Sequence, residues 1–167
     1  MQDENFQRTV VLLVEHGSSG SLGFVLNRKL DATLPDIIEE VQGFPLPIYL
    51  GGPVEPNTLH FIHTLDQLPG SRKVYDGLYW GGDFDALQEL IRQGRVSEQE
   101  IIFFVGYSGW APRQLQQELD RKAWIIAPEN LDYVFIDDPG DLWRRLLQSL
   151  GHKYKIISNY PVDPRLN

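Results

Sequence analysis

The sequence predicts an α/β protein of the α+β type, with a mixed sheet flanked by a few helices. Short β-branched and aromatic runs alternate irregularly with amphipathic segments, and glycine-rich corners separate them. Several of the predicted strands are adjacent in sequence, which is not the pattern of a doubly wound parallel sheet. With 167 residues, 42% of them hydrophobic, and no internal repeat, the chain is expected to form one domain, 1–167.

The composition excludes several classes of function. The formal net charge of −8 repels a phosphate backbone, so nucleic-acid binding is disfavoured. The chain has no cysteine, which excludes disulfides, a thiolate nucleophile and a cysteine-based metal site. No apolar run approaches the roughly 20 residues of a membrane span, and the polar start MQDENFQR is not a signal peptide. We therefore expect a cytoplasmic protein with no membrane partner, no metal and no cofactor.

The most informative segment runs from residue 101 to residue 119. Residues 101–105 form a continuous apolar run, which predicts a strand covered on both faces. Gly106 and Gly109 then predict a turn, and Pro112 is suited to the first position of a helix over 112–122. Strand, turn and helix are thus locally consistent.

The other elements follow from periodicity and capping signals. Apolar and β-branched runs predict strands at 9–14, 22–26, 48–50, 58–64 and 73–80, with further strand candidates at 123–127 and 133–136. Caps at Thr33, Asp83 and Asp141 predict helices ending near Gly43, Gly94 and Gly151. Residues 158–167 contain two prolines and predict an irregular tail.

The turn before the predicted helix 112–122 allows two interpretations. A helix N-terminus beside glycines can receive an anion, and Arg113 supports this because a cation there opposes the helix dipole. Alternatively, the glycines only form a tight corner and Trp110 fills the core beneath it. A nucleophile elbow is excluded because Gly109 directly follows Ser108, and a Walker-type phosphate loop is excluded because its Gly-Lys-Ser/Thr ending is absent.

Histidine and aspartate side chains offer only weak metal signals. His60 and His63 would lie on opposite faces of a strand, so these two alone do not predict a shared metal. Asp76, Asp83 and Asp85 are close in sequence, but Asp83 and Asp85 stand where the start of a helix favours negative charge.

Five motifs together resemble the AlgH/YqgE family of bacterial proteins over nearly the whole chain. The motifs are GSLGFVLNR at 20–28, YLGGPV at 49–54, YDGLYWGGD at 75–83, GYSGW-x-P-x-QL at 106–115 and the closing DPRLN. The resemblance implies a compact fold with a bifurcated sheet that partly closes into a pseudo-barrel. It also implies a family without an established biochemical activity, although one member is described as a regulator of alginate synthesis and transcription.

The sequence departs from the family pattern in two respects. The family usually opens with a strand of the type LLIA-x-P before the segment matching 3–11, and the sequence lacks that strand, so we expect an exposed sheet edge or a shortened version. The position of Arg113 is often a small residue in the family, so an anion site built on its charge would be particular to this chain.

The family pattern also selects candidate site residues. It matches this sequence at His16, Gly23, Asn27, Arg28, Gly51, Gly52, Pro53, Asp76, Gly77, Gly106, Tyr107, Gly109, Trp110 and Gln114. We predict that the glycine-rich corners converge on one cleft. Its predicted ligand-binding residues are Asn27, Arg28, Gly51, Gly52, Gly106, Tyr107, Gly109, Trp110, Arg113 and Gln114, with His16 and Asp76 as weaker candidates. Alternatively, Asn27 and Arg28 tie a hairpin to a neighbouring loop and Gln114 bonds the backbone.

Three functions are compatible with these observations. The first is a non-enzymatic binding or regulatory protein that recognises a small polar or anionic ligand, or a protein partner. The second is a hydrolase or transferase whose general base is His16, His60, His63 or Asp76. The third, direct DNA binding, conflicts with the acidic charge and lacks a helix-turn-helix pattern. We expect the first, and no spacing in the sequence assigns a catalytic residue.

Overall fold

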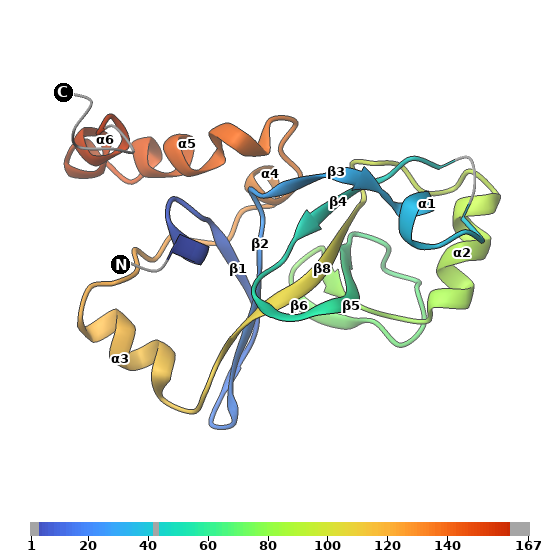
Figure 1. Ribbon diagram of the computed structural model, residues 1–167, viewed down its shortest axis with the longest axis horizontal. Helices are drawn as coiled ribbons and strands as arrows, with labels where there is room; N and C mark the ends of the chain where they lie inside the picture. The colour runs from blue at the N-terminus through green and yellow to red at the C-terminus, as the bar shows by residue number, and fades with distance from the viewer. Residues whose placement is uncertain (1–3, 42–43, 161–167) are drawn as a thin grey trace.

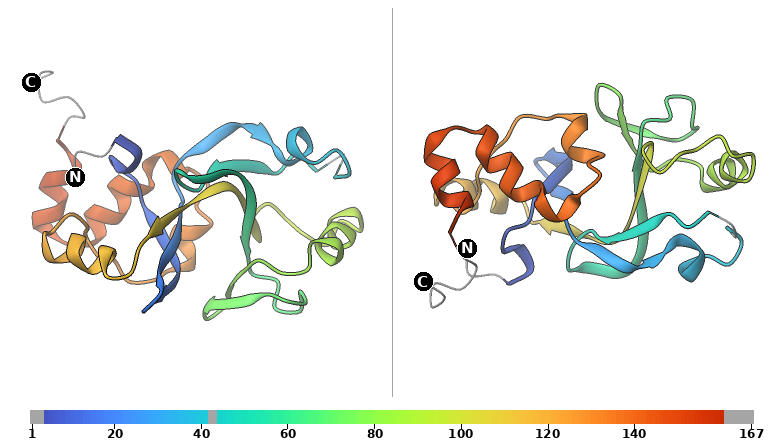
Figure 2. Two further views of the ribbon diagram at one scale, coloured as in Figure 1. Left: turned by 60° about the horizontal axis from the view of Figure 1, so that its bottom comes forward. Right: turned by 90° about the horizontal axis from the view of Figure 1, so that it is seen from above.

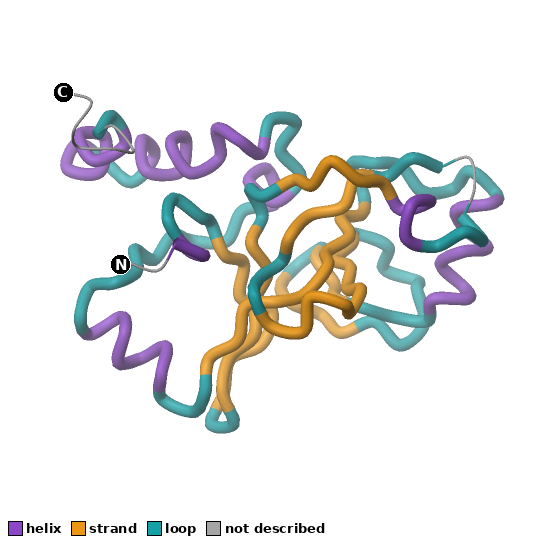
Figure 3. The backbone as a smooth tube through the Cα atoms, viewed as in Figure 1, coloured by secondary structure: helices purple, strands orange, loops and turns teal. Residues whose placement is uncertain are grey.

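The computed structural model describes residues 4–41 and 44–160 and shows a mixed α+β fold (Figure 1). Its eight strands form one sheet: β1 (Val11–Gly17), β2 (Gly20–Val25), β3 (Lys29–Thr33), β4 (Pro47–Leu50), β5 (Val54–His63), β6 (Arg72–Tyr75), β7 (Leu78–Trp80) and β8 (Ile101–Trp110). The helices of the described residues are α1 (Leu34–Ile37), α2 (Phe84–Arg92), α3 (Gln114–Asp120), α4 (Leu131–Val134), α5 (Leu142–Ser149) and α6 (His152–Ser158). Figure 3 shows the strands at the centre and the helices at the periphery.

Strand β8 is the spine of the sheet and the point where it forks. Along one edge, β8 pairs antiparallel with β5. Along the other edge, Phe103 to Val105 pair in parallel with β4, and Ser108 to Trp110 pair antiparallel with β2. One strand edge therefore serves two different branches, which confirms the bifurcated sheet.

The longer branch curls into a nearly closed barrel. Its strands follow the order β1-β2-β8-β5-β7-β6, so β1 and β6 form the two edges. These edges approach each other, because Arg72 Nη1 of β6 lies 3.3 Å from Glu15 Oε2 of β1. An ion pair between side chains thus joins β1 and β6, where main-chain hydrogen bonds would be needed to close the barrel completely.

The two faces of β8 belong to two hydrophobic cores. Ile101 and Phe103 pack in the core beneath α1 and α2, which we call the helix-side core. Ile102 and Phe104 point into the barrel and pack with Phe24 in what we call the barrel core. Phe103 and Phe104 are both fully buried, so the predicted strand covered on both faces is confirmed.

The predicted turn at Gly106 is instead a kink within β8, and it lies opposite a bulge in β5. Gly106 has φ of +65°, and opposite it β5 advances from Val54 to Leu59 while β8 moves only from Tyr107 to Val105. The kink at Gly106 changes the alternation of side chains, so Tyr107 contacts the barrel core although Val105 contacts the helix-side core. The prediction of a break here was wrong because glycine's left-handed conformation kinks the strand without ending it.

Several other predicted boundaries were wrong for local reasons. Helix α3 begins at Gln114, not Pro112, because Arg113 adopts a left-handed φ of +66°. Residues 123–127 form no strand, and 133–136 overlap α4, which Asn130 starts by accepting the Asp132 N–H at 2.8 Å. The helix after Thr33 spans only Leu34–Ile37, and Gly43 lies outside the described residues.

The C-terminal region is more helical than predicted. Helix α6 follows Gly151 and includes Ser158, the first residue of the predicted irregular tail, whereas 161–167, with the DPRLN motif, lie outside the described residues. In both views of Figure 2, α5 and α6 lie at the opposite end of the molecule from α1 and α2. None of the described helices has the length and apolar character needed to cross a bilayer.

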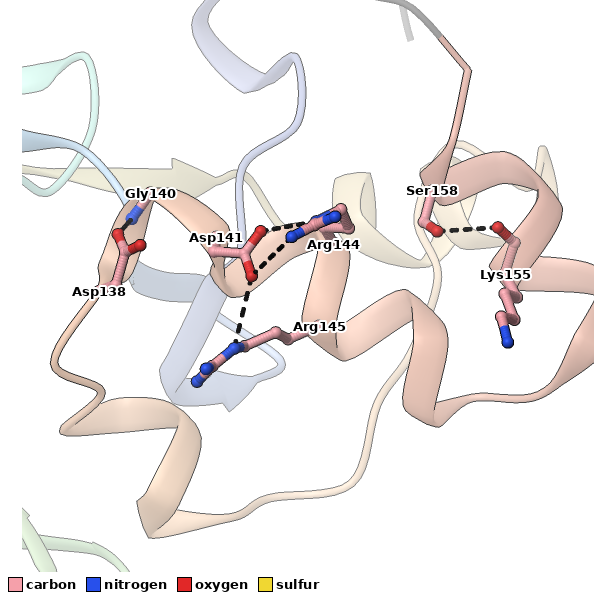
Figure 4. Close-up of polar contacts among 7 residues, drawn as sticks. All are labelled: Asp138, Gly140, Asp141, Arg144, Arg145, Lys155 and Ser158. Carbon is pink, nitrogen blue, oxygen red and sulfur yellow. Dashed lines mark hydrogen bonds and ion pairs between the residues drawn. The ribbon is translucent and has the colours of Figure 1, made fainter.

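Two predicted helix starts differ in how they are capped. Asp83 accepts the Ala86 N–H at 3.1 Å and caps α2 as predicted. Asp141 precedes α5 but makes no side-chain cap bond. Its carboxylate instead pairs with Arg144 at 2.7 Å and Arg145 at 3.4 Å (Figure 4).

We predict that Gly106→Ala lowers the free energy of unfolding by at least about 2 kcal/mol. An alanine would hold a strained left-handed φ, and its Cβ would lie 2.7 Å from the Gly52 carbonyl oxygen. Urea unfolding measures the change. Gly17→Ala is the control, because nothing lies within 4 Å of its added Cβ. Equal stability of the two variants would contradict a structural requirement for glycine at position 106.

Candidate functional site

The predicted glycine corners do meet, at the fork of the sheet. A Cβ added at Gly51 would overlap the Gly106 carbonyl oxygen, and one at Gly52 would overlap the backbone of Tyr107. The buried Ser108 hydroxyl donates to the Gly51 carbonyl at 3.0 Å and holds the two segments together. Backbone therefore packs directly on backbone, and the glycines are needed for this contact.

The neighbouring predicted site residues also meet there. Gly23 and Gly109 lie in the β2–β8 ladder, where Gly23 pairs with Ser108 and Leu22 with Gly109. Tyr107 is half-buried against the barrel core. The structure thus brings the glycine-rich part of the predicted site together as a junction between strands.

The predicted polar lining of this site is bonded within the fold. Asn27 accepts the Val10 N–H at 2.9 Å and donates to the Arg8 carbonyl at 2.8 Å. Gln114 accepts the Ala111 N–H at 2.9 Å and donates to Glu118 at 3.0 Å. These bonds match the alternative interpretation of Asn27 and Gln114 as residues that hold the fold together. Arg28 is half-buried, whereas Arg113 is exposed.

Trp110 belongs to a cluster that sequence reasoning missed. Its indole N–H donates to Glu118 Oε2 at 3.0 Å, and the Trp124 indole donates to the same oxygen at 2.7 Å. Phe6 stacks on Trp110 with 6.1 Å between ring centroids. The carboxylate of Glu118 therefore anchors α3 to the end of β8 and to the following segment.

The candidate general bases do not share a site. His16 is exposed at the β1–β2 hairpin, where its Nδ1 lies 2.7 Å from Ser21 Oγ. Asp76 is exposed and lies 2.6 Å from Lys73 Nζ, a hydrogen bond that lowers the pKa of Asp76 and raises that of Lys73. A general base needs an orienting group and a shielded substrate position, and neither residue has both.

His63 is a structural residue of the helix-side face of β5. It is fully buried, its Nδ1 accepts the Leu65 N–H at 3.1 Å, and its Nε2 donates to the Gly81 carbonyl at 2.8 Å. These bonds require the neutral ring, and burial lowers the pKa of His63. Its lone pair is already used, so it is not available to remove a proton from a substrate.

A cavity of about 470 Å³ opens at the edge of β5, where β7 ends. Strand β7 pairs with β5 only at Ile62 and His63 before the chain turns at Gly81 and Gly82. The cavity is lined mainly by apolar and aromatic residues, namely Ile38, Leu59, His60, Phe61, Trp80, Gly81, Gly82 and Phe84. The early end of β7 thus leaves a hollow beside a strand edge.

The main chain of β5 is open at this hollow. The Gly51 N–H binds the Val105 carbonyl, so the main-chain groups of Val105 point away from β5. Leu59 pairs with Val105, and in an antiparallel ladder its own N–H and C=O must then point away from β8, toward the cavity. The main-chain N–H and C=O of Phe61 point to the same edge, where the carbonyl accepts the Gly81 N–H at 2.9 Å. The cavity therefore combines an aromatic lining with main-chain hydrogen-bonding groups.

His60 supplies the titratable side chain of the cavity lining. The Thr58 hydroxyl donates to the Glu55 carbonyl, so it accepts from His60 Nε2 at 2.9 Å. The other ring nitrogen, Nδ1, is then an acceptor without a hydrogen-bond partner among the described residues. Burial lowers the pKa of His60, with Glu55 acting in the opposite direction, so the ring is neutral at pH 7.

Sequence reasoning assigned His60 only as a possible base and did not select Trp80 or Phe84. The signal was present in the Gly81-Gly82 corner between Trp80 and the α2 cap, which shortens β7. A second cavity of about 470 Å³ lies between α5 and α6 and is lined by Gln148, Gly151, His152, Lys155, Ile156 and Asn159. Within 4–41 and 44–160, no three His, Asp or Glu side chains are grouped so that they could hold a metal ion.

We predict that His63 makes the stability of the protein pH-dependent. Because the folded pKa lies below the unfolded value of 6.5, the contribution is fully present above that pH and decreases as the pH falls below it. His63→Phe should lower the free energy of unfolding at pH 7.5 by about 1–3 kcal/mol, because the Leu65 N–H loses its acceptor and the Gly81 carbonyl loses its shorter hydrogen bond. The variant should also have a flatter pH profile. Urea unfolding between about pH 5 and pH 7.5 tests this.

The exposed His16→Asn variant should keep the wild-type profile. Parallel profiles for wild type and His63→Phe would show that His63 is not the group responsible.

The chain is similar to a set of bacterial proteins over its whole length. A model of the AlgH-like family matches residues 1–155. A UPF0301 protein from Cytophaga hutchinsonii is 44% identical over 167 residues, which cover 99% of this chain and 92% of the relative. A UPF0301 protein from Parabacteroides distasonis is also 44% identical, over 100% of this chain and 86% of the relative.

Two solved structures have the same fold. The AlgH protein from Pseudomonas aeruginosa, also a UPF0301 protein, aligns with a TM-score of 0.72 and 28% identity over 98% of this chain and 89% of that chain. A protein from Corynebacterium diphtheriae aligns with a TM-score of 0.80 and 24% identity over 96% of this chain and 86% of that chain. With the family model covering most of the sequence, the chain belongs to the AlgH-like family.

Proposed function

We propose that this protein is a non-enzymatic binding protein whose ligand is an extended segment of a partner protein. The segment pairs with the open edge of β5, and one of its side chains enters the adjacent cavity. The observation that supports this is the coincidence of two features: a main-chain edge at Leu59, for which the described residues provide no partner, and an aromatic hollow lined by Phe61, Trp80 and Phe84. Strand addition of this kind uses main-chain hydrogen bonds for affinity and a side-chain pocket for specificity.

The chemistry of the cavity favours this ligand over the small polar or anionic molecule expected from the sequence. A small anion needs several converging donors, whereas the lining here is mainly apolar. Among the described residues, the groups available for hydrogen bonding are the N–H and C=O of Leu59, the N–H of Phe61 and the Nδ1 of His60. An extended peptide presents donors and acceptors at matching intervals along its backbone.

A catalytic function has less support. Histidine and hydroxyl groups meet at His16–Ser21, His60–Thr58 and His63–Ser71. The first pair lies exposed on a hairpin, and no group orients the second ring nitrogen of His16 within the described chain. In the other two pairs the histidine nitrogen that faces the hydroxyl carries the proton, so it cannot act as the base. Hydrolysis by such a pair also requires oxyanion donors and exclusion of water. A binding function requires only the shape and edge that are present at β5.

Direct DNA binding has the least support. Residues 142–160 hold four Lys or Arg residues and no Asp or Glu, which makes this region locally basic. Two of the four, Arg144 and Arg145, are paired with Asp141 (Figure 4). The remaining positive charge is small beside the net charge of −8.

We predict that Leu59→Pro weakens peptide binding at least about tenfold, because proline removes the N–H that points to the incoming segment. The probes are peptides selected from a random displayed library on the wild-type protein, and fluorescence anisotropy measures their affinity. Leu59→Ala is the matched control. It shortens the same side chain but keeps the N–H, so it should bind more tightly than Leu59→Pro by several fold.

Proline at this position breaks no bond to β8, because Leu59 makes none, so Leu59→Pro should fold as Leu59→Ala does. Circular dichroism and melting temperature check this. If no peptide is enriched on the folded wild-type protein, or if the two variants bind equally well, the proposed site is wrong.

A further inference from the structure

We infer that the segment bound at β5 is basic, with an apolar side chain for the cavity and Lys or Arg residues close to it on either side. This inference rests on the proposed function. The strand edge and the cavity do not determine the charge of the partner. The charged side chains around the cavity do.

The rim of the cavity carries several exposed carboxylates. Glu39 and Glu40 follow the lining residue Ile38, and Asp83 and Asp85 flank the lining residue Phe84. At most two residues of chain separate each of them from the lining, so all lie within about a Debye length of the bound segment. Glu55 adds a fifth carboxylate, which acts electrostatically on His60.

The basic side chain that contacts the lining is already neutralised. Arg72 lies over the Trp80 ring at 5.4 Å and pairs with Glu15 at 3.3 Å. Its ion pair is with Glu15, so it does not offset the charge of Glu40 or Asp85. The Arg72–Trp80 contact also shows that this aromatic surface accepts a guanidinium group, which a peptide arginine would carry.

The distribution of charge along the chain also favours a basic partner. Residues 142–160 carry four positive and no negative side chains, so the rest of the chain holds a net charge of −12. Helices α5 and α6 lie at the opposite end of the molecule from α1 and α2 (Figures 1 and 2). Residues 28–110, which include every residue that lines the cavity, carry twelve acidic and six basic side chains, and their field attracts cationic segments and repels acidic or phosphorylated ones.

The size of the open edge limits what can bind. It runs from Leu59 to Phe61, and it is bounded by β7 on one side and by Pro56 and the left-handed Glu55 on the other. Only a few residues of a partner can form ladder bonds there. Affinity and specificity must then depend on the cavity and on charge, so removal of the rim charge should have a measurable effect.

The peptide selection described above tests the inference through the sequences it enriches. We expect Lys or Arg within two residues of an aromatic or aliphatic residue, and an affinity that falls when salt rises from about 50 to about 500 mM. In the variant Glu40→Lys/Asp85→Lys, the selected peptides should bind about five- to tenfold more weakly.

The control variant is Glu129→Lys/Asp137→Lys, which makes the same change in net charge at two exposed residues that flank α4, neither of which lines the cavity or adjoins a lining residue in sequence. It should bind within about twofold of wild type. Enrichment of acidic or phosphorylated sequences, or equal losses in the two double variants, would overturn the basic-partner inference. Binding that still distinguishes Leu59→Pro from Leu59→Ala would then leave the proposed function standing, whereas absence of any enriched peptide would remove both.

Discussion

The close approach of two backbone segments at the fork of the sheet is the constraint on which the fold depends. Gly51 and Gly52 lie directly against Gly106 and Tyr107, and no side chain fits between them. Because β4 reaches β8 in this way, one edge of β8 can pair first with β4 and then with β2. The helix-side core grows on the first branch and the barrel core on the second. The Ser108 hydroxyl, bonded to the Gly51 carbonyl, satisfies a buried polar group at the junction.

The candidate binding site is a consequence of how this sheet ends. Strand β7 must leave β5 after two paired residues, since the chain turns at Gly81 and Gly82 to begin α2. The turn is tightly packed, because a Cβ at Gly82 would lie 2.8 Å from the side chains of Leu68 and Ser71. An exposed strand edge normally promotes aggregation. Here the edge is short and ends near Pro56, so it can accept one segment without becoming a template for further strands.

Two histidines on one strand show how differently the same residue type is used. Strand alternation placed His60 and His63 on opposite faces, and the structure agrees. His63 is enclosed by Leu65, Gly81 and Ser71, and both of its nitrogens are bonded. His60 lies against Phe24 and Tyr107, and its Nδ1 has no hydrogen-bond partner among the described residues. The difference comes from loops distant in sequence, which β5 itself does not encode.

The sequence by itself determined the fold class, the central strand, the α2 cap at Asp83 and, through five motifs, the family. These depend on local periodicity, capping chemistry and residue identity, which act over a few positions. Only the tertiary structure decided that the glycine corners form a packed junction, that Asn27 and Gln114 are used internally, and that the hollow lies beside β5. Those properties depend on which strand edges meet and where pairing stops, and both are set by non-local contacts such as the pairing of Ser21 in β2 with Trp110 in β8.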